Sequence, residues 1–595
     1  MSEYHAPLRD MRFVLEEIVN MKAINSLPGY GEATPDLVDA VLEEANKLAS
    51  GVLAPLNQVG DEQHSRLVDG VVRAPDGFAE AHQQFVESGF SGLPFDPDYG
   101  GQGLPYVLGA PLNEMWASAN MGYSLLPLLT QGGIDLISHY GTPEQKSIYL
   151  ENLVTGKWSG TMNLTEPQAG SDVGAVKTKA EQQIDGSYKI TGTKIFITWG
   201  DHELADNIIH LVLARLPDAP GGTKGISCFI VPKYLINEDG SRGERNDVRC
   251  VSLEHKLGIH ASPTAVMSFG DEGGATGYLV GPENSGMRCM FVMMNNARFG
   301  VGLEGIAIAE RAYQHALAYA KERVQGRVVG GAQGAAIVDH PDVRRMLMTM
   351  KALTEASRAL AYYAGGQNDI SNHHEDEIVR QAAYDRLALL TPLVKAWSTD
   401  IGVQVASLGV QVHGGMGFIE ETGAAQYYRD ARIAPIYEGT NGIQALDLVG
   451  RKLPLAGGDT VAALFAEISG VISELQSGDL AEVGKTLAEA LEALVEATGW
   501  IATGDADDPR SQGTGATNYL EMFSTVVGGW LMGRAALAAR RRLANDEGDA
   551  GFNQAKIATT RFFAEQILSR VPGLLKAVTS SSEATFAIDP DQMTG

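Results

Sequence analysis

The chain has 595 residues, 44% of them hydrophobic, and at roughly 100–200 residues per domain this length predicts three to five folded units. Its 46 Lys and Arg against 73 Asp and Glu give a net charge of −27, which repels phosphate backbones and disfavours nucleic-acid binding. The cysteines Cys228, Cys250 and Cys289 form no CxxC pair, which excludes a disulfide scaffold and a Cys-rich metal site.

The N-terminal sequence lacks the basic start and apolar core of a secretory signal. Apolar stretches such as 208–214 are far shorter than the ~20 residues that span a membrane. The sequence therefore predicts a cytoplasmic protein without integral membrane association. An organelle enzyme that had lost its presequence would look the same.

The first half of the chain divides into a helical part and a β-rich part. From Thr34 to about Lys157 apolar residues recur at spacings of three and four, as in 36–45, which predicts helices. Short β-rich runs separated by Gly, Pro, Asn and Asp follow up to about Gly281 and predict an antiparallel barrel or sandwich. The predicted strands are 188–198, 208–214, 226–231, 249–253 and 265–269.

The second half is predicted to be helical. Long Ala-rich segments cover 300–329, 342–365, 376–408 and 441–450. A linker at 452–459 leads to a last helical region that a polar stretch, 503–515, splits as a predicted mobile loop. The fold class is therefore α+β and multidomain, with a middle β-unit between helical units and an additional helical unit at the C-terminus. The predicted units are an extension at 1–33, a helical domain at 34–158, a β-domain at 159–285, a helical domain at 286–450 that forms a four-helix bundle, and a further helical domain at 451–595.

Apolar stripes in the last unit must be buried against another surface. They run through Leu480–Thr498 and Tyr519–Ala544, the second ending near Arg540-Arg541-Arg542. Arginines in a last turn suit the negative helix terminus, and an amphipathic helix that ends in arginines also suggests a membrane surface. Because the chain is strongly acidic, we expect the unit to pack on the rest of the protein.

Two motif-like segments have simpler interpretations than a site. Gly300-Val-Gly-Leu-Glu-Gly follows no predicted strand, so it predicts close helix packing rather than dinucleotide binding. His373-His-Glu-Asp-Glu is typical of a solvated loop, and no metal site is predicted.

Three segments are candidates for chemistry, although each is also compatible with a plain turn, strand or helix start. Met162–Val173 combines hydroxyls with a glycine that allows close approach of a ligand, and Lys194–Trp199 is a strand with aromatic residues. Tyr437-Glu-Gly-Thr-Asn-Gly places a carboxylate beside an aromatic ring in an apolar neighbourhood. Such surroundings raise the pKa of a carboxyl group, so Glu438 is a general-base candidate.

Together these segments resemble the acyl-CoA dehydrogenases, over Ser50 to about Val449. The 162–173 segment resembles the family's flavin-binding TEPGAGSD motif, with Gln168 where a glycine is usual. Phe196-Ile-Thr resembles its flavin-stacking W-I-T strand, and Gln411-Val-His-Gly-Gly-Met-Gly-Phe resembles the segment that contacts the flavin of a partner subunit. Arg429-Asp-Ala-Arg-Ile-Ala-Pro-Ile-Tyr-Glu-Gly-Thr resembles its catalytic motif. Three further segments, Tyr4–Phe13, Leu257–Thr264 and Asp339–Leu347, resemble a large bacterial subgroup with an extra C-terminal helical domain. That subgroup acts on methylmercaptopropionyl and medium- to long-chain acyl thioesters.

The resemblance implies FAD as cofactor, an acyl-CoA substrate and a set of residues that bind them. The implied FAD contacts are Met162, Leu164, Thr165, Ser171, Phe196, Ile197, Thr198, Arg323, Gln411, Gly414, Gly415, Thr440 and Asn441. The implied contacts to the acyl-CoA are Ser171, Asn295, Arg298, Tyr437 and Gly439.

The implied reaction is the dehydrogenation of an acyl-CoA thioester to its trans-2-enoyl form. Glu438 abstracts the α-proton, the β-hydride goes to flavin N5, and electrons pass to an electron-transferring flavoprotein. A partner subunit completes the flavin site, which implies a homodimer. Two alternatives remain on the same fold: a flavin oxidase or monooxygenase, and a flavin-containing DNA-protective relative with little catalysis. The sequence does not fix the length of the acyl chain.

Overall fold

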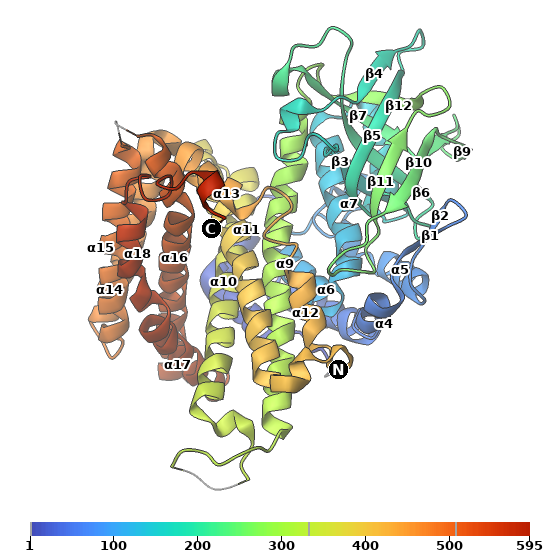
Figure 1. The fold of residues 1–595 in the computed structure, drawn as a ribbon. Coiled ribbons are helices and arrows are strands. Elements are labelled where there is room, and N and C mark those ends of the chain that lie inside the picture. The colour runs from blue at the N-terminus through green and yellow to red at the C-terminus, as the bar shows by residue number, and fades with distance from the viewer. Residues whose placement is uncertain (1–2, 331–333, 506–507, 595) are drawn as a thin grey trace.

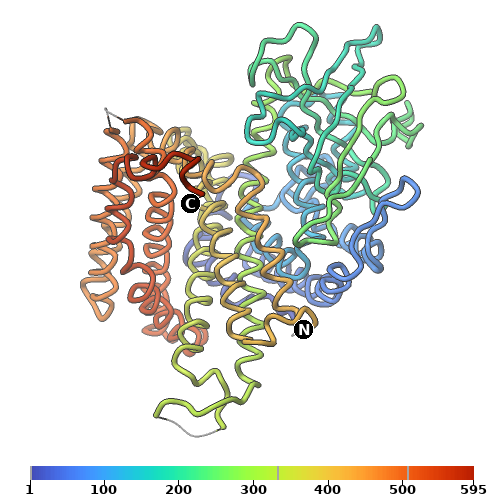
Figure 2. The backbone as a smooth tube through the Cα atoms, viewed as in Figure 1, coloured from blue at the N-terminus to red at the C-terminus, as the bar shows by residue number. Residues whose placement is uncertain are grey.

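The computed structural model describes residues 3–330, 334–505 and 508–594. Figures 1 and 2 show the β-unit on one side of a bundle of long helices and the C-terminal helical unit on the other. The mixed α and β architecture with an additional C-terminal helical unit confirms the predicted fold class.

The N-terminal part is helical, as predicted. Thr34 begins α3 by accepting a hydrogen bond from the backbone N–H of Leu37, with Pro35 in the first turn. A short hairpin of β1 (Arg66–Val68) and β2 (Val71–Arg73), which was not predicted, interrupts the helices. The α-helices are α1 (Leu8–Phe13), α2 (Met21–Asn25), α3 (Pro35–Leu48), α4 (Leu56–Gln63), α5 (Phe78–Glu87), α6 (Gly109–Ala119), α7 (Met121–Tyr140) and α8 (Pro143–Val154).

The middle unit contains a closed ring of strands. β5 pairs with β12, β12 with β7, β7 with β6, and β4 pairs with both β6 and β5, which completes a barrel. β10 and β11 extend from β5, and β3 lies beside β6. The prediction of a purely antiparallel sheet is wrong at two places, because β3 and β4 both run parallel to β6. The strands are β3 (Trp158–Asn163), β4 (Lys179–Gln182), β5 (Tyr188–Thr198), β6 (Asn207–Arg215), β7 (Ile226–Pro232), β8 (Tyr234–Ile236), β9 (Arg242–Arg245), β10 (Val248–Leu253), β11 (Thr264–Phe269) and β12 (Ala275–Val280).

Three long helices form the central bundle: α9 (Gly286–Glu322), α10 (Pro341–His373) and α11 (Glu377–His413). α9 begins at Gly286, where the sequence predicts that the helical domain begins, and so extends N-terminal of the Ala-rich segment at 300–329. A Cβ added at Gly305 would lie 2.3 Å from the carbonyl oxygen of Ser398 on α11. The glycines of the Gly300–Gly305 segment therefore allow two helices to approach closely, as predicted. Two short helices, α12 (Ala424–Ala431) and α13 (Asn441–Asp447), follow α11.

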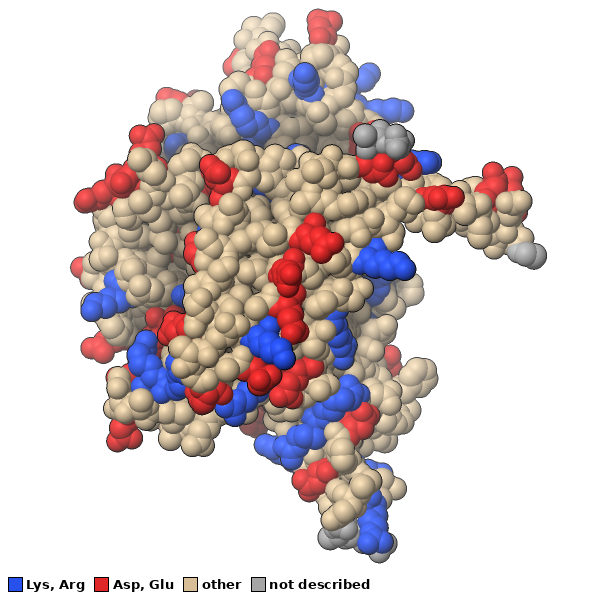
Figure 3. All heavy atoms as spheres, turned by 90° about the vertical axis from the view of Figure 1, so that its left-hand side faces the viewer, with Lys and Arg blue, Asp and Glu red and all other residues tan. Residues whose placement is uncertain are grey.

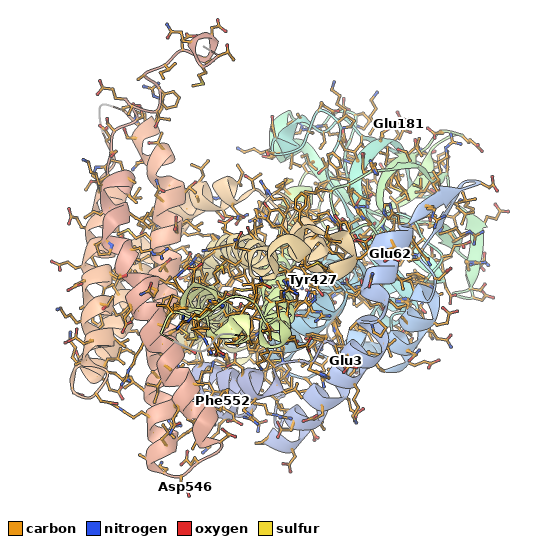
Figure 4. All side chains as sticks on the ribbon, turned by 60° about the horizontal axis from the view of Figure 1, so that its bottom comes forward. Glu3, Glu62, Glu181, Tyr427, Asp546 and Phe552 are labelled. Atoms are coloured by element: carbon orange, nitrogen blue, oxygen red, sulfur yellow. The ribbon has the colours of Figure 1, made fainter. Side chains whose placement is uncertain are left out.

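The C-terminal unit packs on this bundle, as predicted. A Cβ at Gly528 of α16 would lie 2.5 Å from the ring of Trp397 on α11. Phe552 of α17, which is labelled in Figure 4, packs edge-on against Phe13 of the N-terminal extension, with 5.5 Å between ring centroids. The unit consists of α14 (Asp459–Gln476), α15 (Ala481–Thr503), α16 (Arg510–Ala544), α17 (Ala550–Gln566) and α18 (Val571–Val578).

Two expectations about this unit need correction. The predicted mobile loop at 503–515 is helical from Arg510 onward, because Pro509 precedes α16 and starts it there; residues 506–507 lie outside the described part. Val495, assigned to the buried stripe of α15, is 48% exposed.

The arginines at the end of α16 are bound to acidic side chains. Arg541 and Arg542 pair with Glu17 and Glu16 of the N-terminal extension, and Arg540 pairs with Asp479. On the side of the molecule that Figure 3 shows, basic and acidic side chains are interspersed, mainly in the lower half. Among the described residues, segments 455–476 and 510–544 are long and apolar enough to cross a membrane by length and composition alone. In the second, 89% of the apolar window is buried inside the protein.

Candidate active site

Glu438 lies in a strained turn between α12 and α13. Its φ is +56° and that of Gly439 is +80°, so two consecutive residues adopt left-handed conformations. Three side chains hold their carbonyl groups. Arg298 Nε and Gln444 Nε2 each donate to the Glu438 carbonyl oxygen at 3.3 Å, and Lys395 Nζ donates to that of Gly439 at 2.9 Å. Cations from α9 and α11 therefore fix the backbone that presents Glu438.

The Glu438 side chain has the acidity of a general base. Burial raises the pKa of its carboxyl group to about 7, and the charges of Arg298 and Lys395 limit the rise. A carboxylate with a pKa near neutrality is both available and basic enough to take a proton at physiological pH.

The segment that precedes Glu438 is attached to two other units. Arg429 Nη1 donates to Asp61 of α4 at 2.8 Å, and the Asp430 carboxylate accepts the backbone N–H of Ile259 at 2.5 Å. A Cβ at Gly258 would lie 2.5 Å from the carbonyl carbon of Arg429, so only glycine fits against this backbone. These contacts seat the Glu438 segment on the N-terminal helices and the β-unit.

The residues after Glu438 fix the start of α13. The Thr440 hydroxyl accepts the backbone N–H of Ile443 and caps the helix. Asn441 Oδ1 accepts a hydrogen bond from Lys395 Nζ at 2.8 Å, and its Nδ2 donates to Asp400 at 2.8 Å. The side-chain amide of Asn441, predicted to contact FAD, is thus engaged within the protein.

A β-bulge in β5 turns Phe196 outward. Ile197 lies opposite Ala265 of β11 and Lys194 opposite Met267, so Ile195 and Phe196 together face a single residue. Phe196 has a φ of +59° and is 59% exposed, whereas the Ile197 side chain is 2% exposed in the barrel core. Of the two predicted FAD contacts, only Phe196 offers its side chain; Ile197 offers backbone.

The 162–173 segment is tied to β5 by a buried ion pair. Lys194 Nζ lies 2.8 Å from Glu166 Oε1 and donates to the Leu164 carbonyl oxygen at 3.0 Å. Glu166 also accepts hydrogen bonds from the backbone N–H groups of Lys177 and Thr178. Burial alone would raise the pKa of Glu166, but the charge of Lys194 and these bonds lower it to about 2.

The predicted FAD contacts near this ion pair differ in how far their side chains are exposed. Thr165, Met162 and Thr198 are half-buried, Ser171 is exposed, and Leu164 is buried.

The residues expected to serve a partner subunit lie apart from Glu438. Arg323 ends α9, and Gln411, Gly414 and Gly415 lie at the end of α11; all four are exposed. Both helices end at the lower end of the bundle in Figure 1, whereas α13 lies at its upper end. One chain therefore does not bring this group together with Glu438.

The residues expected to contact the acyl-CoA also differ in exposure and orientation. Asn295 is exposed, but Arg298 is 7% exposed and points to the Glu438 turn rather than to the surface. The Tyr437 hydroxyl donates to Glu304 of α9.

The sequence analysis did not identify Lys395, Gln444, Glu304, Glu166 or Lys194. Glu166 and Lys194 lie inside two of the segments singled out for chemistry, and Glu304 lies inside the Gly300–Gly305 segment, which was interpreted as helix packing. Lys395 and Gln444 are single polar residues within helices.

Four family models cover most of the chain. They describe the acyl-CoA dehydrogenase N-terminal domain at residues 39–157, the middle domain at 161–271, the C-terminal domain at 284–453 and an acetyl-CoA dehydrogenase C-terminal-like domain at 464–589. A 3-methylmercaptopropionyl-CoA dehydrogenase from Ruegeria pomeroyi is 49% identical over 98% of this chain and 99% of its own. The chain belongs to the acyl-CoA dehydrogenase family. A butyryl-CoA dehydrogenase from Syntrophomonas wolfei is 37% identical over 98% of both chains.

Solved structures agree with this assignment. The butyryl-CoA dehydrogenase of Megasphaera elsdenii has a TM-score of 0.58 at 28% identity and covers 71% of this chain and 99% of its own. Caenorhabditis elegans ACDH-11 in complex with C11-CoA covers 100% of this chain and 97% of its own with a TM-score of 0.77; at 20% identity it supports the fold alone.

This acyl-CoA dehydrogenase uses FAD, the cofactor of its family. The residues present fit that group. Phe196 offers an exposed ring for stacking, Thr165 and Thr198 offer accessible hydroxyls nearby, and exposed Arg323 offers a guanidinium suited to a pyrophosphate.

Proposed function

We propose that the enzyme converts a short acyl-CoA thioester to the trans-2-enoyl-CoA, with Glu438 as the base that takes the α-proton. The observation that carries the proposal is the Glu438 carboxyl group itself. Its pKa lies near 7, and its backbone is held by Arg298 and Lys395. Because the backbone of Glu438 is already fixed, its carboxylate needs no rearrangement when the substrate binds. This lowers the free-energy cost of reaching the transition state.

The proton moves from the α-carbon to a carboxylate oxygen of Glu438. The electron pair of the broken α-C–H bond forms the α,β double bond, and the β-hydrogen departs as hydride with the electron pair of its own C–H bond. Bound FAD supplies the two-electron acceptor for that hydrogen. The backbone N–H of Glu438 donates to the thioester oxygen and stabilises the negative charge that develops there.

The FAD contacts are proposed for residues whose groups are accessible. Phe196, Thr165, Thr198, Met162 and Ser171 hold the flavin side of the site. Leu164, Ile197 and Asn441 contact FAD through their backbone groups. The Thr440 hydroxyl accepts a hydrogen bond as the cap of α13 and can still donate one to FAD.

Arg323, Gln411, Gly414 and Gly415 serve the FAD of a second copy of the chain, because they lie at the opposite end of the bundle from α13. The assembly proposed is therefore a homodimer. Light scattering that showed a monomer with bound, active FAD would contradict it.

Electrons are proposed to leave through an electron-transferring flavoprotein. One solved structure similar to this chain is described as the electron transferring flavoprotein of Acidaminococcus fermentans; it has a TM-score of 0.58 at 27% identity and covers 70% of this chain and 97% of its own. The names of the relatives from R. pomeroyi and S. wolfei support 3-methylmercaptopropionyl-CoA and butyryl-CoA as the first substrates to test.

The test is anaerobic flavin reduction by each thioester, followed in a stopped-flow instrument and repeated with octanoyl-CoA. Rapid reduction by the two short thioesters is the expected result. Reduction by octanoyl-CoA alone would contradict the short-chain assignment, and no reduction by any thioester would contradict the reaction.

A further inference from the structure

A buried carboxyl group, Glu304, lies beside the half-buried Glu438 segment. It lies on α9, is 2% exposed, and accepts a hydrogen bond at Oε2 from the hydroxyl of Tyr437, the residue that precedes Glu438. Its other oxygen, Oε1, is buried and has no hydrogen-bond partner among the described residues. A buried oxygen without a partner is costly for a charged carboxylate and much less so for a neutral acid.

The position of Glu304 on α9 directs it to the space around Glu438. Met293, Ala297, Val301 and Glu304 follow one another at spacings of four, four and three, so they share one face of the helix. Gly132 of α7 contacts Met293 on this face, since a Cβ there would lie 2.8 Å from its Cγ. The face therefore looks toward α7 and the Tyr437–Glu438 segment.

The titratable groups around Glu304 come from two other elements. Tyr437 and Glu438 lie on the turn before α13, and Lys395 lies on α11. Burial and the charge of Glu438 raise the pKa of Glu304, and the Tyr437 hydrogen bond and Lys395 oppose them, leaving it at about 8. When Glu438 is ionised, a second negative charge at Glu304 would repel both Glu438 and the negative charge that develops on the thioester.

We propose that Glu304 is a positioning residue that acts as a neutral acid: it anchors Tyr437 beside Glu438 and keeps the site at a single negative charge while the α-proton is removed. The inference rests on Glu438 being the base. It requires that ionisation of Glu304 slows the reaction, and that an uncharged amide of the same shape does not.

The variant that tests this is Glu304→Gln in the FAD-loaded enzyme. Its amide oxygen still accepts from Tyr437, and the side chain cannot ionise. Flavin reduction by butyryl-CoA is measured anaerobically between pH 6 and pH 10. In the wild type the rate falls as Glu304 ionises, whereas the variant has no such group. The ratio of the rate at pH 9 to the rate at pH 7.5 is therefore expected to be ~10-fold higher in the variant than in the wild type.

Two further variants separate this role from others. Glu310→Gln is the matched control: Glu310 is also buried on α9 and pairs with Arg358 at 2.7 Å, so its loss should lower stability and leave the pH profile unchanged. Lys395→Arg tests the other group that could titrate in this range, because burial lowers the pKa of Lys395 to about 8 and arginine stays charged.

Three results would overturn the proposal: an alkaline decline unchanged in Glu304→Gln, a decline displaced only in Lys395→Arg, or a Glu304→Gln enzyme inactive at every pH. A second readout does not depend on turnover. Because Glu438, with a pKa of about 7, is itself partly protonated at pH 7, the readout is the infrared difference spectrum. Wild type minus Glu304→Gln should contain a protonated-carboxyl C=O band that wild type minus Glu310→Gln lacks, and its absence from the first difference would equally refute the neutral acid. If Glu438→Gln still reduced flavin, the proposed function would fail, whereas the infrared result would still decide the state of Glu304.

Discussion

The buried Glu166–Lys194 pair offers a quantitative test of how the 162–173 segment is held. Lys194→Met removes the cation and leaves Glu166, with a side chain only 4% exposed, without its charge partner. Against the effect of burial, Lys194 lowers the pKa of Glu166 to about 2, but burial lowers the pKa of Lys194 itself to about 8, so neither shift alone gives the energy of the pair. Removing one partner of a buried pair typically costs about 3–5 kcal/mol, because the other charge is left buried without compensation. Lys194→Met is therefore expected to destabilise the β-unit by about 3–5 kcal/mol.

The double variant Glu166→Gln/Lys194→Met separates charge from position. It leaves no unpaired buried charge, so stability should return to within ~1–2 kcal/mol of the wild type. The Leu164 carbonyl group still lacks its donor, so FAD should bind more weakly than in the wild type.

The assay is the urea midpoint at which FAD fluorescence is released, with the rate of FAD loss measured separately. Lys189→Met is the matched control: this lysine lies on the same strand, is half-buried and donates to the Gly274 carbonyl oxygen at 3.2 Å. A midpoint for Lys194→Met no lower than that for Lys189→Met would refute the reasoning.

The remaining predictions concern stability and pH. Because the Glu166 pKa is lowered on folding, its contribution to stability is present above pH ~4.5 and should be lost as pH falls toward 2, which thermal melts at stepped pH would show. Gly258→Ala should destabilise by about 2 kcal/mol or more, since its Cβ would meet backbone 2.5 Å away, and a melting temperature unchanged from wild type would contradict the seating of the Glu438 segment. Arg541→Ala should cost less than ~1 kcal/mol, because this arginine is 56% exposed; a larger loss by calorimetry would mean that the N-terminal extension depends on it.

Local patterns in the sequence predicted most of the fold and, within the site, the segment that contains Glu438. The strand at 188–198 matches β5 at both ends because it alternates between buried and exposed residues and is bounded by turn residues. Glu438 could be recognised because aromatic and apolar residues surround it in the sequence. α16 was truncated in the prediction because its first turns contain Gly, Ser and Thr, and packing against the end of α18 outweighs their low helix propensity.

Pairs that join distant parts of the chain could not be predicted. Arg429 and Asp61 lie 368 positions apart, and Tyr437 and Glu304 lie 133 apart. Arg429 and Tyr437 lie in a recognised motif, but nothing in the sequence points to Asp61 or Glu304 as their partners, since an isolated Asp or Glu is typical of an exposed helix face. Only the fold shows that Lys395 and Glu304 are buried beside Glu438.

The most direct test of the account is the pH dependence of flavin reduction, compared with that of Glu438→Gln. The rate in the wild type should rise with pH through about 7, because the base must be ionised and burial holds its pKa there. Glu438→Gln should bind FAD and substrate normally and show at least ~10³-fold slower reduction at every pH. Reduction of Glu438→Gln at a rate near that of the wild type would contradict the account, because the proton would then be taken by another group.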